Sequence, residues 1–288
     1  DNVLDTLQNL AKHHRTLLNI PIIGITGTNG KTTSKELINA VLSSEKCCYA
    51  TKGNFNNHIG VPLSILEITS SHEIAIIEMG ANHIGEIAFL CNISQPIFGV
   101  ITNIGKAHLE GFGSFESVIK AKSELYNYIQ KNNGNVFVNN EAELLIELAD
   151  NIRKTTYGKN GDYKGSIASN TPFVSVQFGE NSIISNLIGD YQFYNIMLAI
   201  SVGKYFEITD KNIKKAIESY TPKNNRSEII KTKSNTIILD AYNANPSSMT
   251  AMLHSFAKQN YENKLCILGD MLEMGSTSSQ EHKIIIDL

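Results

Sequence analysis

A glycine-rich loop between a short apolar run and an amphipathic segment constrains this chain more than any other feature of its sequence. The loop, Gly24-Ile-Thr-Gly-Thr-Asn-Gly-Lys-Thr-Thr33, follows Pro21-Ile22-Ile23. It precedes residues 34–42, in which apolar side chains recur at helical spacing. A strand, a glycine loop and a helix in this order are the context of a phosphate-binding loop. The sequence therefore predicts a site for the phosphates of ATP or GTP.

The chemistry of such a loop assigns a role to each part of it. Backbone N–H groups around Gly27 and Gly30 would surround the phosphates, Lys31 would reach the β- and γ-phosphates, and Thr32 would offer its hydroxyl to magnesium. The spelling departs from the general pattern at one place, because Ile25 stands where a glycine is usual. The alternative, a glycine-rich turn before a solvated lysine, stays open at this point.

Bulk properties exclude several classes of protein. A length of 288 residues predicts two domains, and 42% hydrophobic with 18% charged residues is typical of a soluble globular protein. The net charge of −3 gives no general attraction to nucleic acid or anionic membranes. No apolar run is long enough for a membrane span, so we expect a cytoplasmic protein without membrane insertion. The chain starts at Asp1 and stops at Leu288 inside an apolar element, so we expect a piece of a longer protein.

Two polar side chains follow later predicted strands. Glu78 comes directly after the apolar run 73–77, and His108 lies in the loop after residues 96–102. The carboxyl ends of parallel strands meet at one edge of a sheet, where α/β proteins bind ligands. Glu78 is therefore a candidate magnesium ligand. A lone histidine is more often structural, but the position of its loop favours a functional role for His108.

Lys122 falls in the apolar stripe of a predicted helix over residues 117–130. Val118, Leu125 and Ile129 share its face. An inward-facing lysine must extend its amine to solvent, pair with an acid, or lose its charge. The sequence leaves these alternatives open, but a neutral amine could also react with CO₂ to give a carbamate.

The remaining chain predicts further α/β structure. Asn56 and Asn57 lie in a polar stretch, residues 50–62, that is either a surface loop or a recognition loop for a substrate carboxylate or phosphate. Strand-like runs at 135–138, 173–178 and 182–184 are expected to extend the sheet, and helices are expected over 195–206 and 210–220. The polar, proline-broken run 221–228 predicts a domain boundary. After it we expect one βαβ unit, with strands at 236–240 and 264–268 and a helix over 247–259.

Several ordered motifs together resemble those of the Mur ligases, the ATP-dependent amide ligases of peptidoglycan precursor synthesis. The motifs are Thr26-Gly-Thr-Asn-Gly-Lys-Thr32, Glu78-Met-Gly-Ala-Asn82, His108-Leu-Glu-Gly-Phe-Gly113 and Asp240-Ala-Tyr-Asn-Ala-Asn-Pro246. The last of these, with Leu268-Gly-Asp-Met-Leu-Glu-Met-Gly275, is similar to the branch that adds D-alanyl-D-alanine. The resemblance covers essentially the whole chain.

The resemblance implies an α/β architecture in which a P-loop ATPase domain with a mostly parallel sheet is followed by the start of a Rossmann-like domain. Residues 1–20 would be a linker helix, 21–222 the central ATP-binding domain, and 223–288 part of the C-terminal domain. The UDP-binding domain that precedes these in the family has no counterpart in this sequence. Whether this piece alone is active, or only binds ATP, is therefore open.

The resemblance also implies site roles, residue by residue. The ATP phosphates would be held by Gly27, Thr28, Asn29, Gly30, Lys31, Thr32 and Thr33. Thr32 and Glu78 would share one magnesium ion, and His108 would serve a second, bridged by a carbamate on Lys122. Asn56 and Asn57 would lie near the γ-phosphate and the substrate. Further nucleotide contacts would come from Asn195, Arg226, Asp240 and Asn243, although the family's adenine motif is altered at Tyr191 and Gln192.

The reaction that the resemblance implies joins D-alanyl-D-alanine to UDP-N-acetylmuramoyl-tripeptide through an acyl phosphate, with ATP and two Mg²⁺ ions. Such a ligase would serve cell-wall biogenesis, and with it cell shape and cell division. We expect a monomer without a nucleic-acid partner. A sister ligase, such as the diaminopimelate- or lysine-adding enzyme or folylpolyglutamate synthetase, is the nearest alternative. A P-loop phosphotransferase or a motor ATPase is a more distant one.

Overall fold

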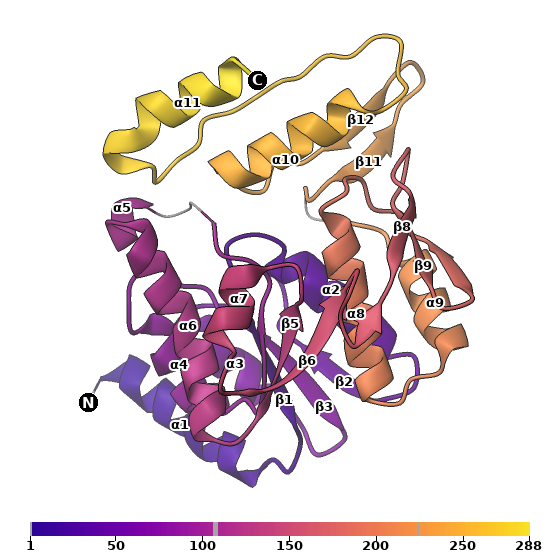
Figure 1. Cartoon of the computed structure of the whole chain (residues 1–288). Coiled ribbons are helices and arrows are strands. Elements are labelled where there is room, and N and C mark those ends of the chain that lie inside the picture. The colour runs from indigo at the N-terminus through magenta and orange to yellow at the C-terminus, as the bar shows by residue number, and fades with distance from the viewer. Residues whose placement is uncertain (1, 106–108, 224) are drawn as a thin grey trace.

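The computed structural model describes residues 2–105, 109–223 and 225–288, and its centre is a seven-stranded sheet (Figure 1). The strand order is β2-β3-β1-β4-β5-β6-β7, and each neighbouring pair is parallel. These strands are β1 (Ile22–Thr26), β2 (Cys48–Ala50), β3 (Ile74–Glu78), β4 (Phe98–Ile101), β5 (Asn135–Asn139), β6 (Arg153–Gly158) and β7 (Tyr163–Lys164). The expected α/β fold with a mostly parallel sheet is confirmed.

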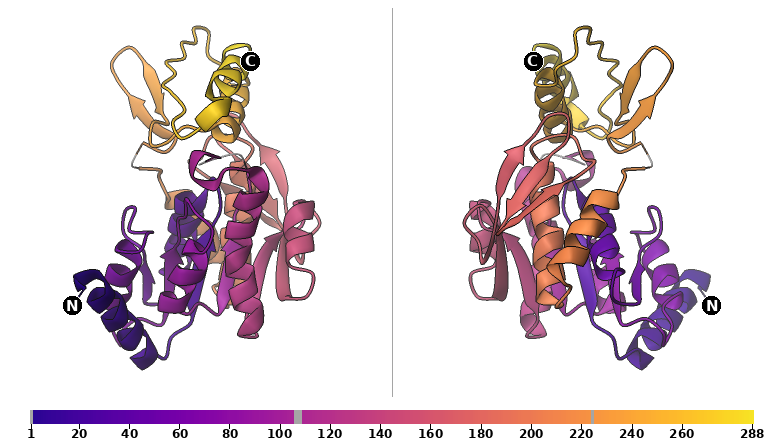
Figure 2. Two further views of the ribbon diagram at one scale, coloured as in Figure 1. Left: turned by 90° about the vertical axis from the view of Figure 1, so that its left-hand side faces the viewer. Right: turned by 90° about the vertical axis from the view of Figure 1, so that its right-hand side faces the viewer.

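Helices cover both faces of this sheet, as Figures 1 and 2 show. Parallel strands need such cover because both of their faces are apolar, and all five residues of β1 and of β3 are buried. One face carries α1 (Val3–Leu17), α3 (Gly60–Leu66), α4 (Glu86–Ser94), α6 (Phe115–Lys131) and α7 (Glu143–Leu148). The other carries α2 (Lys31–Leu42), α8 (Gln192–Tyr205) and α9 (Asp210–Ser219). The described chain contains no helix long and apolar enough to cross a membrane.

Three short strands form a separate antiparallel sheet beside α8. They are β8 (Ser166–Ser169), β9 (Ser175–Phe178) and β10 (Asn181–Ile184), in the order β10-β9-β8. The expectation that 173–178 and 182–184 extend the main sheet is wrong. Gly179, with φ of 55°, allows the chain to reverse tightly after β9, so β10 pairs back on it. The main sheet is extended instead by β6 and β7, which were not predicted.

The last part of the chain lies over the edge of the main sheet at which its strands end (Figures 1 and 2). It contains an antiparallel hairpin of β11 (Glu228–Lys231) and β12 (Thr236–Leu239). α10 (Pro246–Ala257) follows, then the short η1 (Gly275–Thr277) and α11 (Ser278–Ile286). A short helix, α5 (Leu109–Phe112), precedes α6 in the central part.

The predicted strand at 264–268 is not formed. Leu265 and Ile267 are 79% and 89% exposed, and β12 pairs with β11 instead of with a parallel neighbour. A parallel strand is stable only with hydrogen-bonded neighbours and cover on its faces. The described residues here supply only a small core of Met271, Met274 and Ile285. The predicted helix over 247–259 is confirmed as α10. Pro246 starts this helix, and Asn245 and Ser248 form a capping box at its N-terminus.

Candidate active site

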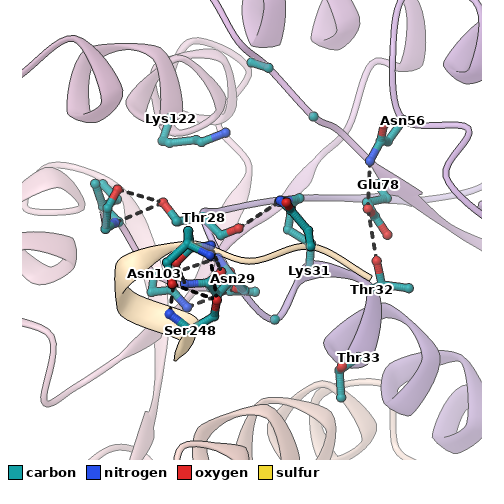
Figure 3. A pocket seen from close by; sticks show the side chains of 18 of the residues that line it. Thr28, Asn29, Lys31, Thr32, Thr33, Asn56, Glu78, Asn103, Lys122 and Ser248 are labelled. Atoms are coloured by element: carbon teal, nitrogen blue, oxygen red, sulfur yellow. Dashed lines mark hydrogen bonds between the residues drawn. The ribbon is translucent and has the colours of Figure 1, made fainter. Parts of the chain in front are cut away.

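A cavity of about 870 Å³ lies where the central strands β1, β3 and β4 end. It is lined by the turn after each strand, by α6 and α8, and by the segment from Arg226 to Ala251. The lining includes most of the residues predicted for the site: Thr28, Asn29, Gly30, Lys31, Thr32, Thr33, Asn56, Asn57, Glu78, Lys122, Asn195, Arg226, Asp240 and Asn243. Figure 3 labels eight of them, namely Thr28, Asn29, Lys31, Thr32, Thr33, Asn56, Glu78 and Lys122. Gly27 lies in the loop behind this lining. His108 lies outside the described residues.

The loop from Gly27 to Lys31 has the backbone of a phosphate cradle. Gly27 and Gly30 have φ of 143° and 78°, a region that favours glycine, and a Cβ on Gly27 would overlap Thr102 Oγ1. The turn after β4 fixes the loop from one side. There Asn103 accepts hydrogen bonds from Thr28 N through its carbonyl, at 3.0 Å, and from Asn29 N through Oδ1, at 2.9 Å.

Lys31 turns back across its own loop. Its Nζ donates to the carbonyls of Gly27, at 2.7 Å, and Thr28, at 3.1 Å. Burial lowers the pKa of Lys31, and the nearby Glu78 carboxylate opposes this effect. The ammonium therefore lies against the carbonyl groups of its own loop, and its contact with the phosphates stays a prediction.

Glu78 lies at the end of β3, and its carboxylate accepts hydrogen bonds from two neighbouring side chains. Its Oε1 accepts from Asn56 Nδ2 at 2.9 Å and from Thr32 Oγ1 at 3.3 Å. The carboxylate is 1% exposed, and its Oε2 is buried without a hydrogen bond among the described residues. A carboxylate and a hydroxyl at this spacing are ligands that suit magnesium. These residues therefore fit the metal that accompanies a nucleotide.

The described residues contain no group of three histidines, cysteines, aspartates or glutamates that could hold a metal alone. A metal here would take its other ligands from phosphate, water or a modified side chain.

Lys122 lies in α6 and points into the cavity (Figure 3). It is 2% exposed, and Val118, Leu125 and Ile129 are buried on the same helix, so the predicted inward position is confirmed. Burial lowers the pKa of Lys122 to about 7, and the positive charge of Lys31 adds to this effect. Its Nζ lies 5.8 Å from the centre of the Phe112 ring. A large fraction of this amine is therefore neutral near pH 7.

The two candidate asparagines of the 50–62 loop do different things. Asn56 lines the cavity and donates to Glu78 Oε1. Asn57 Oδ1 accepts from the backbone N–H groups of Ile59, at 3.0 Å, and Gly60, at 2.9 Å. It therefore supports the start of α3, and only its amide nitrogen is left for a substrate.

Asn195 connects the far wall of the cavity to the first turn of α2. Its Oδ1 accepts from Ser34 Oγ at 2.9 Å, and its Nδ2 donates to Gln192 Oε1 at 2.7 Å. Tyr191 also lines the cavity, where burial raises its pKa to about 12. An uncharged ring and two amides form a surface that suits a nucleotide base.

The segment after α9 forms the remaining wall. The Arg226 guanidinium lies 3.7 Å from the centre of the Tyr242 ring, a stacking distance. Asp240 accepts a hydrogen bond from Ser227 N at 3.0 Å, and burial raises the pKa of its carboxyl group. Asn243 also lines the cavity. Arg226, Asp240, Tyr242 and Asn243 thus all line the cavity.

Three residues of the site were not among the predicted ones. Asn103 and Asn245 both bond the phosphate loop, and Lys35, fully buried in α2, faces Glu78. Asn103 stands at the end of a predicted strand, and Lys35 falls in line with the apolar Ile38 and Leu42, so the sequence carries a signal for both. No local pattern predicts that Asn245 meets a loop more than two hundred residues earlier.

Comparisons with known proteins agree with this architecture. The family model described as the Mur ligase middle domain matches residues 25–203, and the one described as the Mur ligase, glutamate ligase domain matches residues 225–287. The domain bounds 1–20, 21–222 and 223–288 remain a prediction. The UDP-N-acetylmuramoyl-tripeptide–D-alanyl-D-alanine ligase of Bacillus subtilis is 37% identical over 98% of this chain and 63% of its own length. The Haemophilus influenzae ligase of that name is 34% identical, over 96% and 63%. The chain thus spans less than two thirds of these relatives.

Solved structures of similar proteins have the same fold. MurF from Acinetobacter baumannii matches with a TM-score of 0.89 at 30% identity, over 99% of this chain and 64% of that one. MurF ligase from Thermotoga maritima in complex with ADP matches with a TM-score of 0.88 at 27% identity, over 100% and 68%. Folylpolyglutamate synthase from Thermotoga maritima has a TM-score of 0.62 at 16% identity, over 88% and 69%, which shows a shared fold alone. By its family-model matches and its relatives, the chain belongs to the Mur ligase family.

Proposed function

We propose that this chain forms the ATP-binding core of an amide ligase that adds D-alanyl-D-alanine to UDP-N-acetylmuramoyl-tripeptide. The observation that carries the proposal is that one cavity contains the loop lysine Lys31, the oxygen pair of Thr32 and Glu78, and the buried amine of Lys122. The names of the relatives and the ADP in the Thermotoga maritima structure support the choice of ATP and of these substrates.

The proposed reaction has two steps, and both need charge to be compensated. The terminal carboxylate of the tripeptide attacks the γ-phosphorus of ATP, which gives an acyl phosphate and releases ADP. The amine of D-alanyl-D-alanine then attacks the acyl carbon, and phosphate leaves. In the first step two anions must approach, and Lys31 would offset part of their repulsion from its place in the loop.

Magnesium fits the proposed site through Thr32 and Glu78, the hydroxyl and carboxylate identified above. When bound, it would withdraw charge from the phosphate oxygens and so favour attack by the carboxylate. We also propose a second magnesium site with His108 and a carbamate on Lys122. The carbamate would form when the neutral Lys122 amine adds to CO₂ and releases a proton, and it would supply a further oxygen ligand.

The remaining predicted residues would bind and orient the substrates. Gly27 to Thr33 would hold the phosphates, and Asn195, with Tyr191 and Gln192, would meet the base. Arg226, Asp240 and Asn243 would close over the nucleotide from the last part of the chain. Asn56 would orient Glu78, and the free amide of Asn57 would meet the tripeptide. Together these walls would exclude water from the acyl phosphate.

In the cell, such an enzyme would act in peptidoglycan precursor synthesis and so in cell-wall biogenesis, cell shape and cell division. We propose a cytoplasmic monomer, with the two peptide substrates as partners and no nucleic acid.

The decisive experiment measures ATP consumption by the full-length protein supplied with UDP-N-acetylmuramoyl-tripeptide and D-alanyl-D-alanine. We expect a product extended by the dipeptide, detected by mass. ATP consumption that ignores the dipeptide but responds to diaminopimelate, lysine or glutamate would instead identify a sister ligase. The isolated 288-residue chain, assayed in parallel, would show whether this piece only binds ATP.

A further inference from the structure

Lys35 carries a buried ammonium group behind the phosphate loop and outside the lining of the cavity. It lies in α2 one turn after Lys31, and its side chain is 0% exposed. Removing a charge from water is costly, so a buried lysine persists only where its partners compensate for the loss. The partners of Lys35 therefore indicate what it does.

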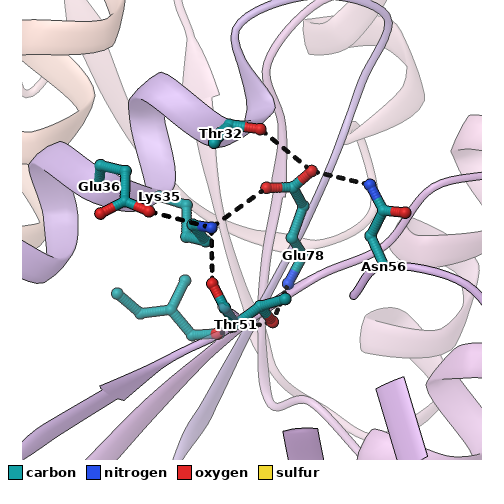
Figure 4. A network of polar contacts seen from close by, with 7 residues as sticks. Thr32, Lys35, Glu36, Thr51, Asn56 and Glu78 are labelled. Atoms are coloured by element: carbon teal, nitrogen blue, oxygen red, sulfur yellow. Dashed lines mark hydrogen bonds and ion pairs between the residues drawn. The ribbon is translucent and has the colours of Figure 1, made fainter. Parts of the chain in front are cut away.

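Three oxygen atoms surround Lys35 Nζ (Figure 4). They are the Thr51 carbonyl at 2.6 Å, Glu36 Oε1 at 3.1 Å and Glu78 Oε2 at 3.6 Å. The Glu36 side chain is 39% exposed, whereas that of Glu78 is 1% exposed. Lys35 thus forms an ion pair with the buried carboxylate of the site.

The two oxygens of Glu78 have different surroundings as a result. Oε1 receives hydrogen bonds from Thr32 and Asn56, whereas Oε2 has no hydrogen bond in the described chain and lies 3.6 Å from the Lys35 ammonium. The charge on one side and the two donors on the other select one orientation of the carboxylate. In this orientation Oε1 is directed to Thr32, at the start of α2.

Thr51 strengthens the arrangement by joining Lys35 to the backbone of Glu78. Its carbonyl accepts from Lys35 Nζ, and its Oγ1 accepts from Glu78 N at 3.0 Å. Lys35 therefore connects α2 to the residue after β2 and to the end of β3. Both the main chain and the carboxylate of Glu78 are fixed relative to the phosphate loop.

We propose that Lys35 is a positioning residue that holds the Glu78 carboxylate in the orientation needed to bind the metal of the nucleotide complex. The inference rests on the proposed function, because it takes Glu78 as a ligand of that metal. Lys35 itself contacts neither nucleotide nor metal. Its effect on binding must therefore pass through Glu78, and this dependence can be measured.

The test compares Lys35→Met with the wild-type full-length protein, using Mn²⁺ as a spectroscopic substitute for Mg²⁺. Mn²⁺ affinity is measured in the presence of ADP by electron paramagnetic resonance, and ADP affinity in EDTA by calorimetry. Loss of a residue that orients a metal ligand weakens metal binding by about 10-fold to 100-fold. We expect such a loss for Mn²⁺, with metal-free ADP affinity unchanged.

Three further variants separate positioning from a general structural effect. Lys204→Met removes a lysine from the ion pair with Asp210, outside the cavity lining, and should leave Mn²⁺ affinity unchanged. Lys35→Arg keeps the positive charge and should restore most of the affinity. Lys35→Gln loses the charge but can still donate to the Thr51 carbonyl, so it serves if Lys35→Met does not fold. It should lose Mn²⁺ affinity as Lys35→Met does.

A double-mutant comparison with Glu78→Gln tests the route of the effect. If Lys35 acts through Glu78, then Lys35→Met should change Mn²⁺ affinity little in the Glu78→Gln background. An equal loss in both backgrounds, or wild-type Mn²⁺ affinity in a folded Lys35→Met or Lys35→Gln protein, would overturn the proposal. These measurements need no acceptor substrate. If the wild-type protein did not make the extended product, this result would count against the proposed function, but the Mn²⁺ measurements would still test the role of Lys35.

Discussion

The side-chain amides of Asn29 and Asn245 hydrogen-bond to each other in both directions, with Nδ2-to-Oδ1 distances of 3.3 Å and 2.7 Å. Asn29 lies in the phosphate loop, and Asn245 caps the N-terminus of α10. The pair therefore joins the central part of the molecule to its last part at the cavity. Because Asn245 also accepts from Ser248 N at 2.9 Å, one side chain serves both the link and the helix cap.

Replacing Asn29 with alanine should loosen α10 without removing its cap. One lost hydrogen-bonded link costs about 1 kcal/mol, which corresponds to roughly fivefold faster opening. Hydrogen exchange of the α10 amides would measure this change. Asn245→Ala removes link and cap together and should cost about 1 kcal/mol more. Asn245→Asp keeps the cap acceptor and is the matched control for the cap, and wild-type exchange in Asn29→Ala would contradict the role of the link.

Lys31→Met should weaken nucleotide binding without lowering the stability of the nucleotide-free protein. Charge-assisted hydrogen bonds contribute about 1.5–3 kcal/mol, so ADP affinity should fall by about 10-fold to 100-fold. Stability without nucleotide should stay equal or rise, since burial already disfavours the charged form of Lys31. Calorimetry with ADP and thermal unfolding would test the two parts. A variant that lost stability and affinity together would show that Lys31 is chiefly structural.

The lowered pKa of Lys122 predicts a pH-dependent stability. Between the folded value of about 7 and the ordinary value of 10.5, the unfolded chain binds a proton that the folded chain does not. The free energy of unfolding should therefore rise with pH in this window, by at most about 1.4 kcal/mol per pH unit from this group, and the gain is absent below it.

Lys122→Met removes this dependence. Its stability advantage over the wild type should be largest below pH 7 and should shrink as the pH rises. Urea unfolding in CO₂-free buffers across this range would measure the difference. Lys120→Met, at an exposed position of the same helix, is the control. A difference between Lys122→Met and the wild type that does not vary with pH would show that Lys122 keeps its proton when folded.

Removal of two buried hydroxyl groups should change the free energy of unfolding in different ways. Thr26 Oγ1 is buried without a hydrogen-bond partner among the described residues, so Thr26→Val should be neutral or stabilise by up to about 1 kcal/mol. Ser185 Oγ donates to the Val174 carbonyl at 2.6 Å and accepts from Leu187 N at 3.2 Å. Ser185→Ala should therefore destabilise by about 1–2 kcal/mol. Denaturant unfolding of the pair would test this, and equal losses would contradict it.

The sequence predicts those parts of the site that are determined by residues close together in the chain. The loop around Gly27 and Gly30 is marked by its glycines, and the inward position of Lys122 follows from helical spacing within α6. Glu78 is found because a polar residue directly after an apolar strand lies at the edge of a parallel sheet. Each of these inferences needs only a dozen neighbouring residues.

The parts that were missed depend on pairing between distant segments. The sequence predicts strand-like runs at 173–178 and 182–184, but it cannot tell which sheet they join, and the reversal at Gly179 decides this. Residues 264–268 have the composition of a strand and lack a neighbour to pair with. The contact of Lys35 with Glu78 likewise requires the tertiary placement of α2 against β3, which spacing along the chain does not encode.

The parallel register of the central strands also affects how rigid the walls of the cavity are. Ile25 lies opposite Glu78, and Thr26 lies opposite Ile101, so neighbouring strand tips are held about 4.8 Å apart by backbone hydrogen bonds. The wall of the cavity that carries the glycine loop is therefore rigid, and its shape is set before any ligand binds. The wall from Arg226 to Ala251 is supported by a much smaller core than those of the central sheet. A ligand that contacts both walls should therefore order mainly the wall from Arg226 to Ala251, and the entropic cost of binding should fall there.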